Sequence, residues 1–246
     1  MRGRAVITVV VVAVWTAAGL WAESRVDATG QLALGLLTAI VLAGVLLLQA
    51  AETRLQAVLV MTVATGAEVV GSLLWGVYVY RFDNLPLFVP PGHALVYLGG
   101  VAFAGLVGRH ARWLVGAAVL SALAWGALGL GILPAVDVSG AVGCALLASI
   151  LIWTRRPVYA GVFFVVAALE LYGTALGTWT WEATVPGLGL PQGNPPSGVA
   201  SGYVLFDVAA LALAGRLVSW RGAARRLAIR SRYAPKLAFG TRSRVG

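Results

Sequence analysis

Long apolar runs follow one another along almost the whole chain, and they restrict the fold more than any other feature. Each run has roughly 16–25 residues, enough for a helix to cross about 30 Å of hydrocarbon. Only 11% of the residues are charged, against about 25% in soluble domains. The runs cover about 5–22, 31–50, 56–80, 93–108, 112–133, 138–154, 157–181 and 198–219. The sequence therefore predicts an all-α, polytopic integral membrane bundle of about eight transmembrane helices, or seven if a short run does not cross.

The positions of the basic residues predict the orientation of this bundle. With the N-terminus in the cytoplasm, all 18 lysine and arginine residues except Arg25 and Arg81 fall in cytoplasmic segments or at inner helix ends. Acidic residues such as Glu23 and Glu182 fall on the opposite side. This positive-inside bias predicts a multi-pass protein of the inner (plasma) membrane with both termini cytoplasmic. Lys236 is the only lysine, and Ala, Gly and Val are abundant, which is typical of a high-GC bacterium.

The C-terminal segment accounts for much of the net charge of +9. Half of the basic residues lie between Arg216 and Arg244, at and after the end of the last apolar run. We expect residues 221–246 to form a basic, partly disordered cytoplasmic tail. Such a tail contacts anionic lipid headgroups, at about 1 kcal/mol per basic residue near the surface. The predicted partner of this charge is thus the bilayer and not nucleic acid.

Two glutamates inside apolar runs open the same short string, Glu-x-x-Gly-[Ser/Thr]-x-Leu. The first copy begins at Glu68 and the second at Glu170, and aromatic residues and a Pro-rich loop follow both. We interpret the chain as two parallel four-helix halves, 1–110 and 111–220, related by an axis along the membrane normal. The alternative is a chance similarity between two apolar helices.

The Pro-rich loops that follow the two strings are themselves alike. The pairs Pro90-Pro91 and Pro195-Pro196 each precede a membrane entry, and Tyr97 and Tyr203 follow at nearly the same distance. Proline fixes the backbone and lacks an N–H group. We therefore expect both loops to pack as rigid flaps over the outer mouth of the bundle.

Acidic residues inside the apolar runs are the candidate catalytic groups. A carboxylate at bilayer depth costs roughly 2.5–3.5 kcal/mol on insertion scales, so it usually faces a cavity, a partner or a substrate path. By helical rise, Glu68 and Glu170 lie ~18 and ~20 Å deep, and Asp207 lies ~14 Å deep. His93, at the outer start of the fourth helix, is the fourth candidate. For each of these the alternative is a structural role.

Side chains near the two glutamates are the candidate substrate-binding residues. Ser72 and Thr174 lie one turn from the carboxyls on the same helix face, where they can hydrogen-bond to them. Gly173 and Gly177 form a small-x-x-x-small pair that permits close helix approach. The predicted binding residues are Ser72, Trp75, Tyr78, Thr174, Trp179 and Trp181. For the aromatic members the alternative is a belt at the lipid headgroups.

Several motifs are absent from the sequence. There is no Walker loop, Rossmann glycine pattern, His-x-x-x-His string or Asp-rich magnesium motif. Cys144 is the only cysteine, which excludes an internal disulfide and a multi-cysteine metal site. These absences argue against a prenyltransferase, a haem protein and an ATP-driven pump. We expect no metal and no cofactor.

The paired Glu-x-x-Gly strings, the aromatic residues after them and the Pro-rich outer loops resemble those of bacterial polytopic carotenoid-biosynthesis membrane proteins, of the carotenoid hydratase and small lycopene cyclase types. The resemblance covers the third, fourth, seventh and eighth helices. It implies acid catalysis on an isoprenoid chain, with Glu68 and Glu170 as proton donors. The Pro-x-Glu-[Glu/Asp] string expected of the small cyclases is absent, which argues against cyclisation.

Three functions fit a central cavity with two carboxyls and aromatic walls. The first is a membrane-embedded enzyme that acts by acid catalysis on an isoprenoid or another lipid. The second is a proton- or cation-coupled transporter of small molecules, and the third is a non-catalytic membrane scaffold or assembly factor. The few polar residues leave little room for a hydrophilic path, which argues against a sugar or amino-acid carrier.

Overall fold

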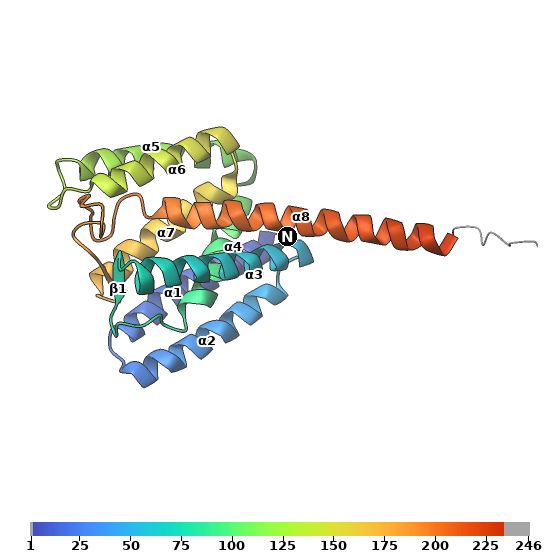
Figure 1. Ribbon diagram of the computed structural model, residues 1–246, viewed down its shortest axis with the longest axis horizontal. Coiled ribbons are helices and arrows are strands. Elements are labelled where there is room, and N and C mark those ends of the chain that lie inside the picture. Colours follow the sequence, from blue (N-terminus) through green and yellow to red (C-terminus); the bar gives the residue numbers. More distant parts are fainter. Residues whose placement is uncertain (1, 234–246) are drawn as a thin grey trace, which may run out of the picture.

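The computed structural model describes residues 2–233, and helices make up most of it (Figure 1). The helices are α1 (Arg2–Glu23), α2 (Ala28–Leu47), α3 (Ala51–Glu68), α4 (Val89–Val107), α5 (Ala111–Gly129), α6 (Val138–Thr154), α7 (Pro157–Ala175) and α8 (Ala200–Tyr233). Two short strands, β1 (Tyr78–Tyr80) and β2 (Trp179–Trp181), lie at one end of the bundle, which we call the ribbon end.

Six segments of the described chain are long and apolar enough to cross a membrane. They are Arg2–Glu23, Ala28–Leu47, Ala51–Leu74, Val89–Gly129, Pro157–Ala175 and Ala200–Leu217. The fourth contains both α4 and α5, which are separated at Gly108, where φ is 56°, a backbone conformation that glycine adopts without steric cost. The fold is thus a helical bundle of the multi-pass membrane type. Eight crossings and two parallel halves stay predictions.

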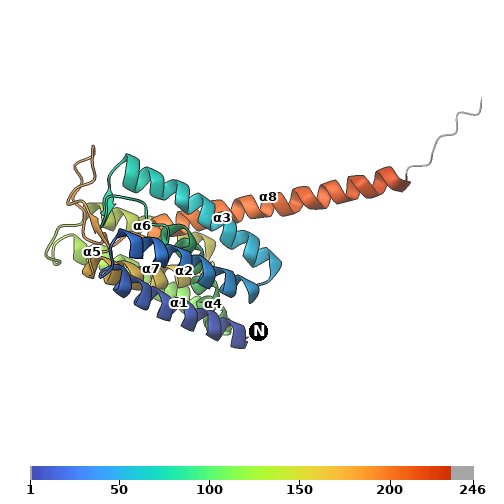
Figure 2. The ribbon, with the colours of Figure 1, turned by 90° about the horizontal axis from the view of Figure 1, so that it is seen from below.

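Helix α8 continues well past the last apolar run. It reaches Tyr233 and extends away from the other helices, as two views at right angles agree (Figures 1 and 2). The first part of the predicted tail, from residue 221, is therefore helical. The disordered end that we expect of this tail lies outside the described residues, from position 234 onward.

Helix α4 lies at the centre of the bundle, with α1, α2, α3 and α7 packed around it. Its residues 93–100 are all buried. Helices α4 and α7 approach closely, since a Cβ atom built on Gly161 would lie 2.3 Å from the carbonyl oxygen of Gly100. Glycine at both positions lets the two backbones touch. This contact fixes α7, which carries Glu170, against α4, which carries His93.

Exchange of Gly161 for alanine should lower stability by about 1–3 kcal/mol, because the new methyl group meets backbone that cannot move aside. Thermal unfolding of the detergent-solubilised protein measures the effect. Gly105→Ala is the matched control, because a Cβ on this glycine of α4 has no neighbour within 4 Å. Equal unfolding temperatures for the two variants would contradict a backbone contact between α4 and α7.

Helix α3 begins at Ala51, earlier than expected, and passes at Glu68 into a π-helical segment, Val69–Leu74. Glu68 lies about 25 Å along the helix from Ala51 but only about 9 Å before Leu74, taking 1.5 Å per residue. Glu170 likewise lies about 8 Å before the end of α7. Both glutamates therefore lie toward the ribbon end of their helices and not near the middle.

The last residues of two apolar runs form strands and not helix, contrary to the expectation for 56–80 and 157–181. Strands β1 and β2 pair antiparallel, with Tyr78 opposite Trp181, Val79 opposite Thr180 and Tyr80 opposite Trp179. This register is symmetric about the central Val79–Thr180 pair. The segments that follow the two Glu strings therefore meet as one ribbon.

Asp137 holds the loop that follows β2 against the start of α6. Its carboxylate accepts hydrogen bonds from the backbone N–H groups of Gly140, Gly193 and Ser197. The first caps α6 and the other two belong to the Pro-rich loop. Asp137 is 2% exposed, so these three donors compensate its burial. The second Pro-rich loop is thus anchored, in agreement with a rigid flap.

Candidate functional site

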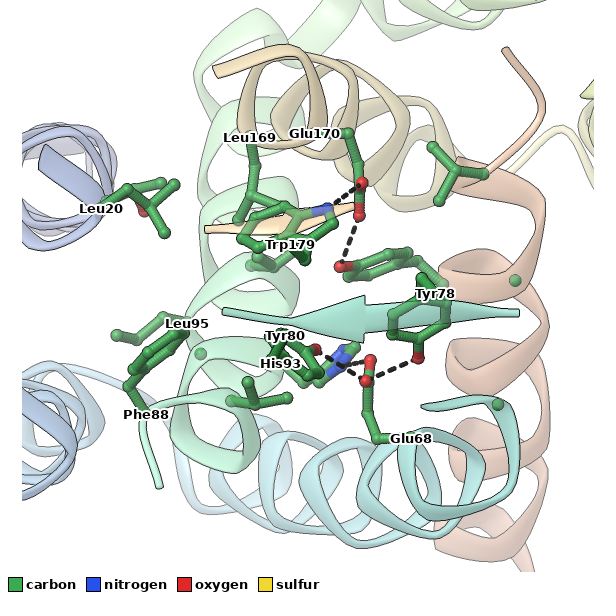
Figure 3. Close-up of a pocket in the computed structure, with 18 of the residues that line it drawn as sticks. Leu20, Glu68, Tyr78, Tyr80, Phe88, His93, Leu95, Leu169, Glu170 and Trp179 are labelled. Carbon is green, nitrogen blue, oxygen red and sulfur yellow. Dashed lines mark hydrogen bonds and ion pairs between the residues drawn. The ribbon is translucent and has the colours of Figure 1, made fainter. Parts of the chain in front are cut away.

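The ribbon brings together the aromatic residues that follow the two glutamates. Side chains of a strand alternate between its faces, so Val79 and Thr180 point away and are exposed. The remaining strand residues, Tyr78, Tyr80, Trp179 and Trp181, hydrogen-bond to the two glutamates. The ribbon therefore forms a shared wall between the two halves of the site (Figure 3).

Glu68 accepts three hydrogen bonds, one of them from a histidine. The hydroxyl groups of Tyr78 and Tyr80 donate to its Oε2 atom at 2.6 and 2.8 Å. Oε1 lies 2.7 Å from Nε2 of His93, and both side chains of this pair are buried. An ionised carboxylate can only accept, so we assign the proton of this contact to His93 Nε2.

Glu170 has a different set of three partners, two indole N–H groups and one phenol hydroxyl. The indole N–H groups of Trp179 and Trp181 reach its Oε2 atom at 2.9 and 3.3 Å. The hydroxyl of Tyr203, on α8, donates to Oε1 at 3.1 Å. An indole nitrogen donates and never accepts. Oε2 of Glu170 therefore serves as an acceptor and is not the position of a proton.

His93 is held in a defined orientation at the start of α4. Its Nε2 atom contacts Glu68, and its ring centroid lies 4.8 Å from that of Tyr203 and 6.1 Å from that of Phe206. Among the described residues none forms a hydrogen bond with its Nδ1 atom. Because a carboxylate fixes the first nitrogen, the second is the one that can exchange a proton with a ligand.

The phenols beside Glu68 remain donors over the whole physiological range. Burial raises the pKa of Tyr78 and of Tyr80, and the negative charge of Glu68 raises both further. Neither hydroxyl therefore ionises near neutral pH, and each keeps a proton to donate. The result is a carboxylate with two phenols and an imidazole fixed around it.

The glycine of each Glu-x-x-Gly string makes room for an aromatic ring of the ribbon. A Cβ atom on Gly173 would lie 2.1 Å from the Trp179 ring, and one on Gly71 would lie 3.3 Å from Tyr78. The expectation that Gly173 serves close approach between helices is therefore wrong. Because each glycine lies three residues after its glutamate, it shares a helix face with it. The missing side chain leaves space there, so that the ring can reach the carboxylate.

Gly173→Ala should push Trp179 away from Glu170 and lower stability by about 1–3 kcal/mol, because the new methyl group meets the buried indole and displaces it from its hydrogen bond with the carboxylate. Near-ultraviolet circular dichroism reports the tryptophan environment, and thermal unfolding reports stability. Gly66→Ala on α3 is the control, since its Cβ has no neighbour within 4 Å. An unchanged tryptophan signal would contradict the proposed packing.

A cavity of about 240 Å³ extends from the two glutamates toward the ribbon end of α1. Aromatic and aliphatic side chains form most of its wall, with rings from Trp15, Trp75, Phe88 and Phe206 beside those of the ribbon. Three carboxylates line it, those of Glu68, Glu170 and Glu23. The combination of an apolar wall and a few fixed polar groups is typical of a small-molecule site.

The structure brings most of the predicted site residues to this cavity, but not all. Glu68, Glu170, His93, Trp75, Tyr78, Trp179 and Trp181 line it. Thr174 donates to the main-chain carbonyl of Glu170 and not to its carboxyl, so that prediction is wrong. Ser72 and Asp207 are buried and do not line the cavity. Asp207 lies one turn of α8 beyond Tyr203.

Two polar residues of the cavity, Tyr203 and Glu23, were not predicted as site residues from the sequence. Tyr80 and Tyr203 donate to the glutamates, and Glu23 lines the cavity. Tyr97 and Tyr203, which follow the two Pro-rich loops at nearly the same distance, do not have equivalent partners, because the Tyr97 hydroxyl donates to Gln56 on α3. Tyr80 belongs to the aromatic residues that follow Glu68 and lines the cavity with them. No sequence pattern marked Glu23 as a cavity residue, because it ends a helix, where an acidic side chain normally faces water.

Comparison with known proteins finds no matching family model, no matching curated protein and no matching solved structure. The resemblance to polytopic carotenoid-biosynthesis proteins stays a hypothesis.

Proposed function

We propose that this chain is a membrane-embedded enzyme that performs acid–base chemistry on an apolar, isoprenoid-type lipid. The observation that carries the proposal is the buried 2.7 Å contact between Glu68 Oε1 and His93 Nε2 at the wall of an aromatic cavity. A carboxylate that fixes one imidazole nitrogen and stabilises the imidazolium is a recurrent arrangement for general acid–base catalysis. His93 is thus the proposed proton donor, in place of the two glutamates.

The reaction we propose begins with a proton transfer from His93. The proton leaves Nδ1 of the imidazolium and forms a C–H bond at one carbon of a substrate C=C bond. The other carbon becomes cationic, and the imidazole becomes neutral. The cation then takes up water and releases a proton, or loses a proton from a neighbouring carbon, and in each case Nδ1 accepts it back. The products are those of hydration or double-bond migration.

The remaining cavity residues suit a cationic intermediate. Aromatic faces attract a cation by about 0.5–2 kcal/mol each, and the cavity is lined by several such rings. Glu170, with three hydrogen-bond partners fixed around it, presents carboxyl oxygens to the cavity without taking part in the proton transfer. In this assignment Glu68 positions His93, and Glu170 stabilises charge.

The experiment is lipid profiling of a host strain that lacks the gene, with its isolated membranes then incubated in buffer made with D₂O. Wild-type protein should restore a lipid that carries deuterium at carbon, because the transferred proton comes from solvent. Complementation with His93→Ala should not restore it. Equal profiles with and without the gene would overturn an enzymatic function. They would also agree with the scaffold alternative, which predicts no change in lipid content.

A second candidate, proton-coupled transport, is favoured by Asp207. This residue is 2% exposed, and its Oδ2 atom has no hydrogen-bond partner among the described residues. A carboxyl inside a membrane span is commonly part of an ion or proton path. Proton uptake into proteoliposomes with a pH-sensitive dye, lost in Asp207→Asn, would support this candidate. Unchanged dye signals in wild-type vesicles would exclude it.

For the cellular setting we propose the plasma membrane of a high-GC bacterium, with both termini cytoplasmic. The distribution of arginine supports this orientation. In it the ribbon end and the cavity lie toward the outer face, and the basic segment after Arg216 contacts anionic headgroups on the inner face. A reporter enzyme that is active only outside the cytoplasm, fused within the 130–136 loop, tests the orientation.

A further inference from the structure

The cavity has a polar end that the proposed chemistry does not use. Glu23, the last residue of α1, is 1% exposed although it lies next to a loop. It lines the cavity in one stripe with Thr16, Gly19 and Leu20, at the spacing of a single helix face. A ligand that lies along this stripe has Glu23 at one end and the Glu68–His93 pair beside it.

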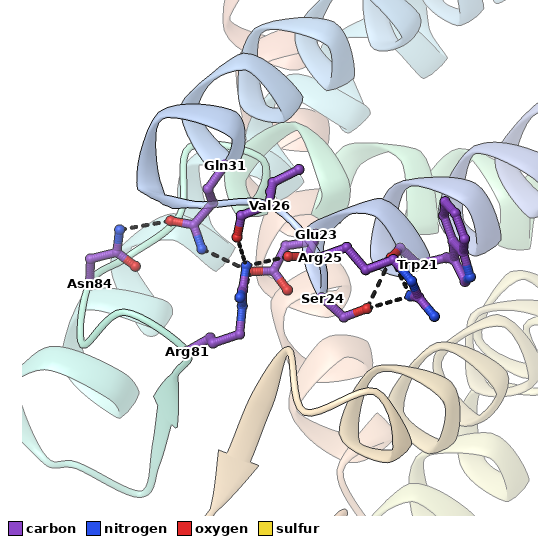
Figure 4. A network of polar contacts seen from close by, with 8 residues as sticks. All are labelled: Trp21, Glu23, Ser24, Arg25, Val26, Gln31, Arg81 and Asn84. Atoms are coloured by element: carbon purple, nitrogen blue, oxygen red, sulfur yellow. Dashed lines mark hydrogen bonds and ion pairs between the residues drawn. The ribbon is translucent and has the colours of Figure 1, made fainter.

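Only one oxygen of Glu23 is occupied. Oε1 accepts from Nε of Arg81 at 3.2 Å and from Nε2 of Gln31 at 2.9 Å. Arg81 also donates to the carbonyl oxygens of Glu23 and Val26 (Figure 4). Oε2 is buried and has no hydrogen-bond partner among the described residues. An unsatisfied buried acceptor costs about 1–3 kcal/mol, so a donor on a ligand would be bound favourably there.

The charge around Glu23 decides which donor fits. Arg81 and Glu23 form an ion pair, so the site has no net charge to attract a cation. Gln31 is held by Asn84, whose amide donates to its Oε1 atom at 2.8 Å. The contact with Asn84 keeps the Gln31 amide directed at Oε1 of Glu23 and leaves Oε2 of Glu23 free. A neutral hydroxyl, which brings one proton and no charge, matches this site better than an ammonium group.

We infer that Glu23 Oε2 binds the hydroxyl of an apolar substrate, so that the substrate class is an isoprenoid-type alcohol anchored at the ribbon end. The inference rests on the proposed function, since it places the same substrate in the same cavity. The cavity of about 240 Å³ corresponds to about eight waters at ~30 Å³ each. It therefore accommodates the hydroxyl and on the order of ten carbon atoms, and a longer chain extends out between helices.

The test uses geraniol, its methyl ether and its aldehyde as probes, with binding to the purified full-length protein in nanodiscs followed by quenching of the cavity tryptophans. Wild type should bind geraniol about tenfold more tightly than the ether, the value of one hydrogen bond. In Glu23→Gln the amide oxygen can keep the bonds from Arg81 and Gln31, which turns the NH₂ group toward the cavity. The Glu23→Gln variant should then bind the aldehyde more tightly than the alcohol.

Asp27→Asn is the matched control, since Asp27 is exposed on the same loop and caps α2 through Gly30, a role that asparagine retains. Its probe preference should equal that of wild type. Equal binding of alcohol and ether by wild type would overturn the anchor while leaving an apolar substrate in place. Binding of no probe would overturn the inference together with the proposed substrate class. Because no turnover is measured, neither result depends on the role of His93.

Discussion

His93→Ala should reduce product formation by at least about 100-fold, because general acid–base groups contribute factors of roughly 10²–10⁴. The variant should remain folded, since the removed ring lies at the cavity and its backbone position at the start of α4 is unaffected. The measurement is the rate of deuterium incorporation into lipid in membranes of the complemented deletion strain. His110→Ala is the control, because His110 is exposed at the opposite end of α4 and should retain full activity.

Glu68→Gln separates the positioning of His93 from direct action by the carboxyl. The amide still accepts a hydrogen bond from the imidazole but no longer stabilises the imidazolium through charge. We expect activity to fall, because the imidazolium then has no opposite charge beside it. A variant pair in which Glu68→Gln is inactive and His93→Ala is active would contradict this assignment and identify the carboxyl as the acid. That outcome would agree with the role implied by the sequence resemblance.

The membrane class was predictable because it depends on an average over many residues. Long apolar runs suffice to predict spanning helices, and six such segments are present in the described chain. The end of each helix depends on a few local contacts, and there the prediction failed. Residues 78–80 are apolar and were therefore interpreted as the end of a helix. Their strand conformation depends on pairing with residues 179–181, about a hundred positions away.

The candidate site was predicted in part for the same reason. Glu68 and Glu170 stand out because a carboxyl is rare in an apolar run, and the repeated string suggested that they share a cavity. The pairing of Glu68 with His93 was not predictable, because it depends on how α3 packs against α4. The role of Gly173 was also missed, since a glycine in an apolar helix has the same appearance whether it admits another helix or an indole ring.

Glu23 and Asp207 show that the position of a residue relative to an apolar run does not determine how the residue is buried in the fold. Glu23 lies at a helix end and was placed at the water-exposed surface, yet Arg81 and Gln31 cover it. Asp207 lies inside an apolar run and was placed in the cavity, yet it is buried one turn of α8 beyond Tyr203, outside the cavity lining. Long-range packing decides both cases, and no local pattern reports it.

Glu170→Leu should prevent recovery of folded protein. The substitution leaves two indole N–H groups and the hydroxyl of Tyr203 without an acceptor in an apolar environment. Each unsatisfied buried donor costs about 1–3 kcal/mol. The sum is a large part of the roughly 5–15 kcal/mol by which proteins are stable. Size-exclusion chromatography of the detergent-solubilised variant, followed by thermal unfolding, measures the loss.

Glu170→Gln distinguishes hydrogen bonding from charge at the same position. Its amide oxygen can accept from both indoles, and the Tyr203 hydroxyl can rotate to accept from the NH₂ group, so the variant should fold. Glu182→Leu is the control for a loss of negative charge at an exposed position after β2 and should unfold near the wild-type temperature. If Glu170→Leu folded as well as this control, the donors around Glu170 would not be what holds the ribbon. Retained folding with reduced activity in Glu170→Gln would instead assign its charge to the reaction.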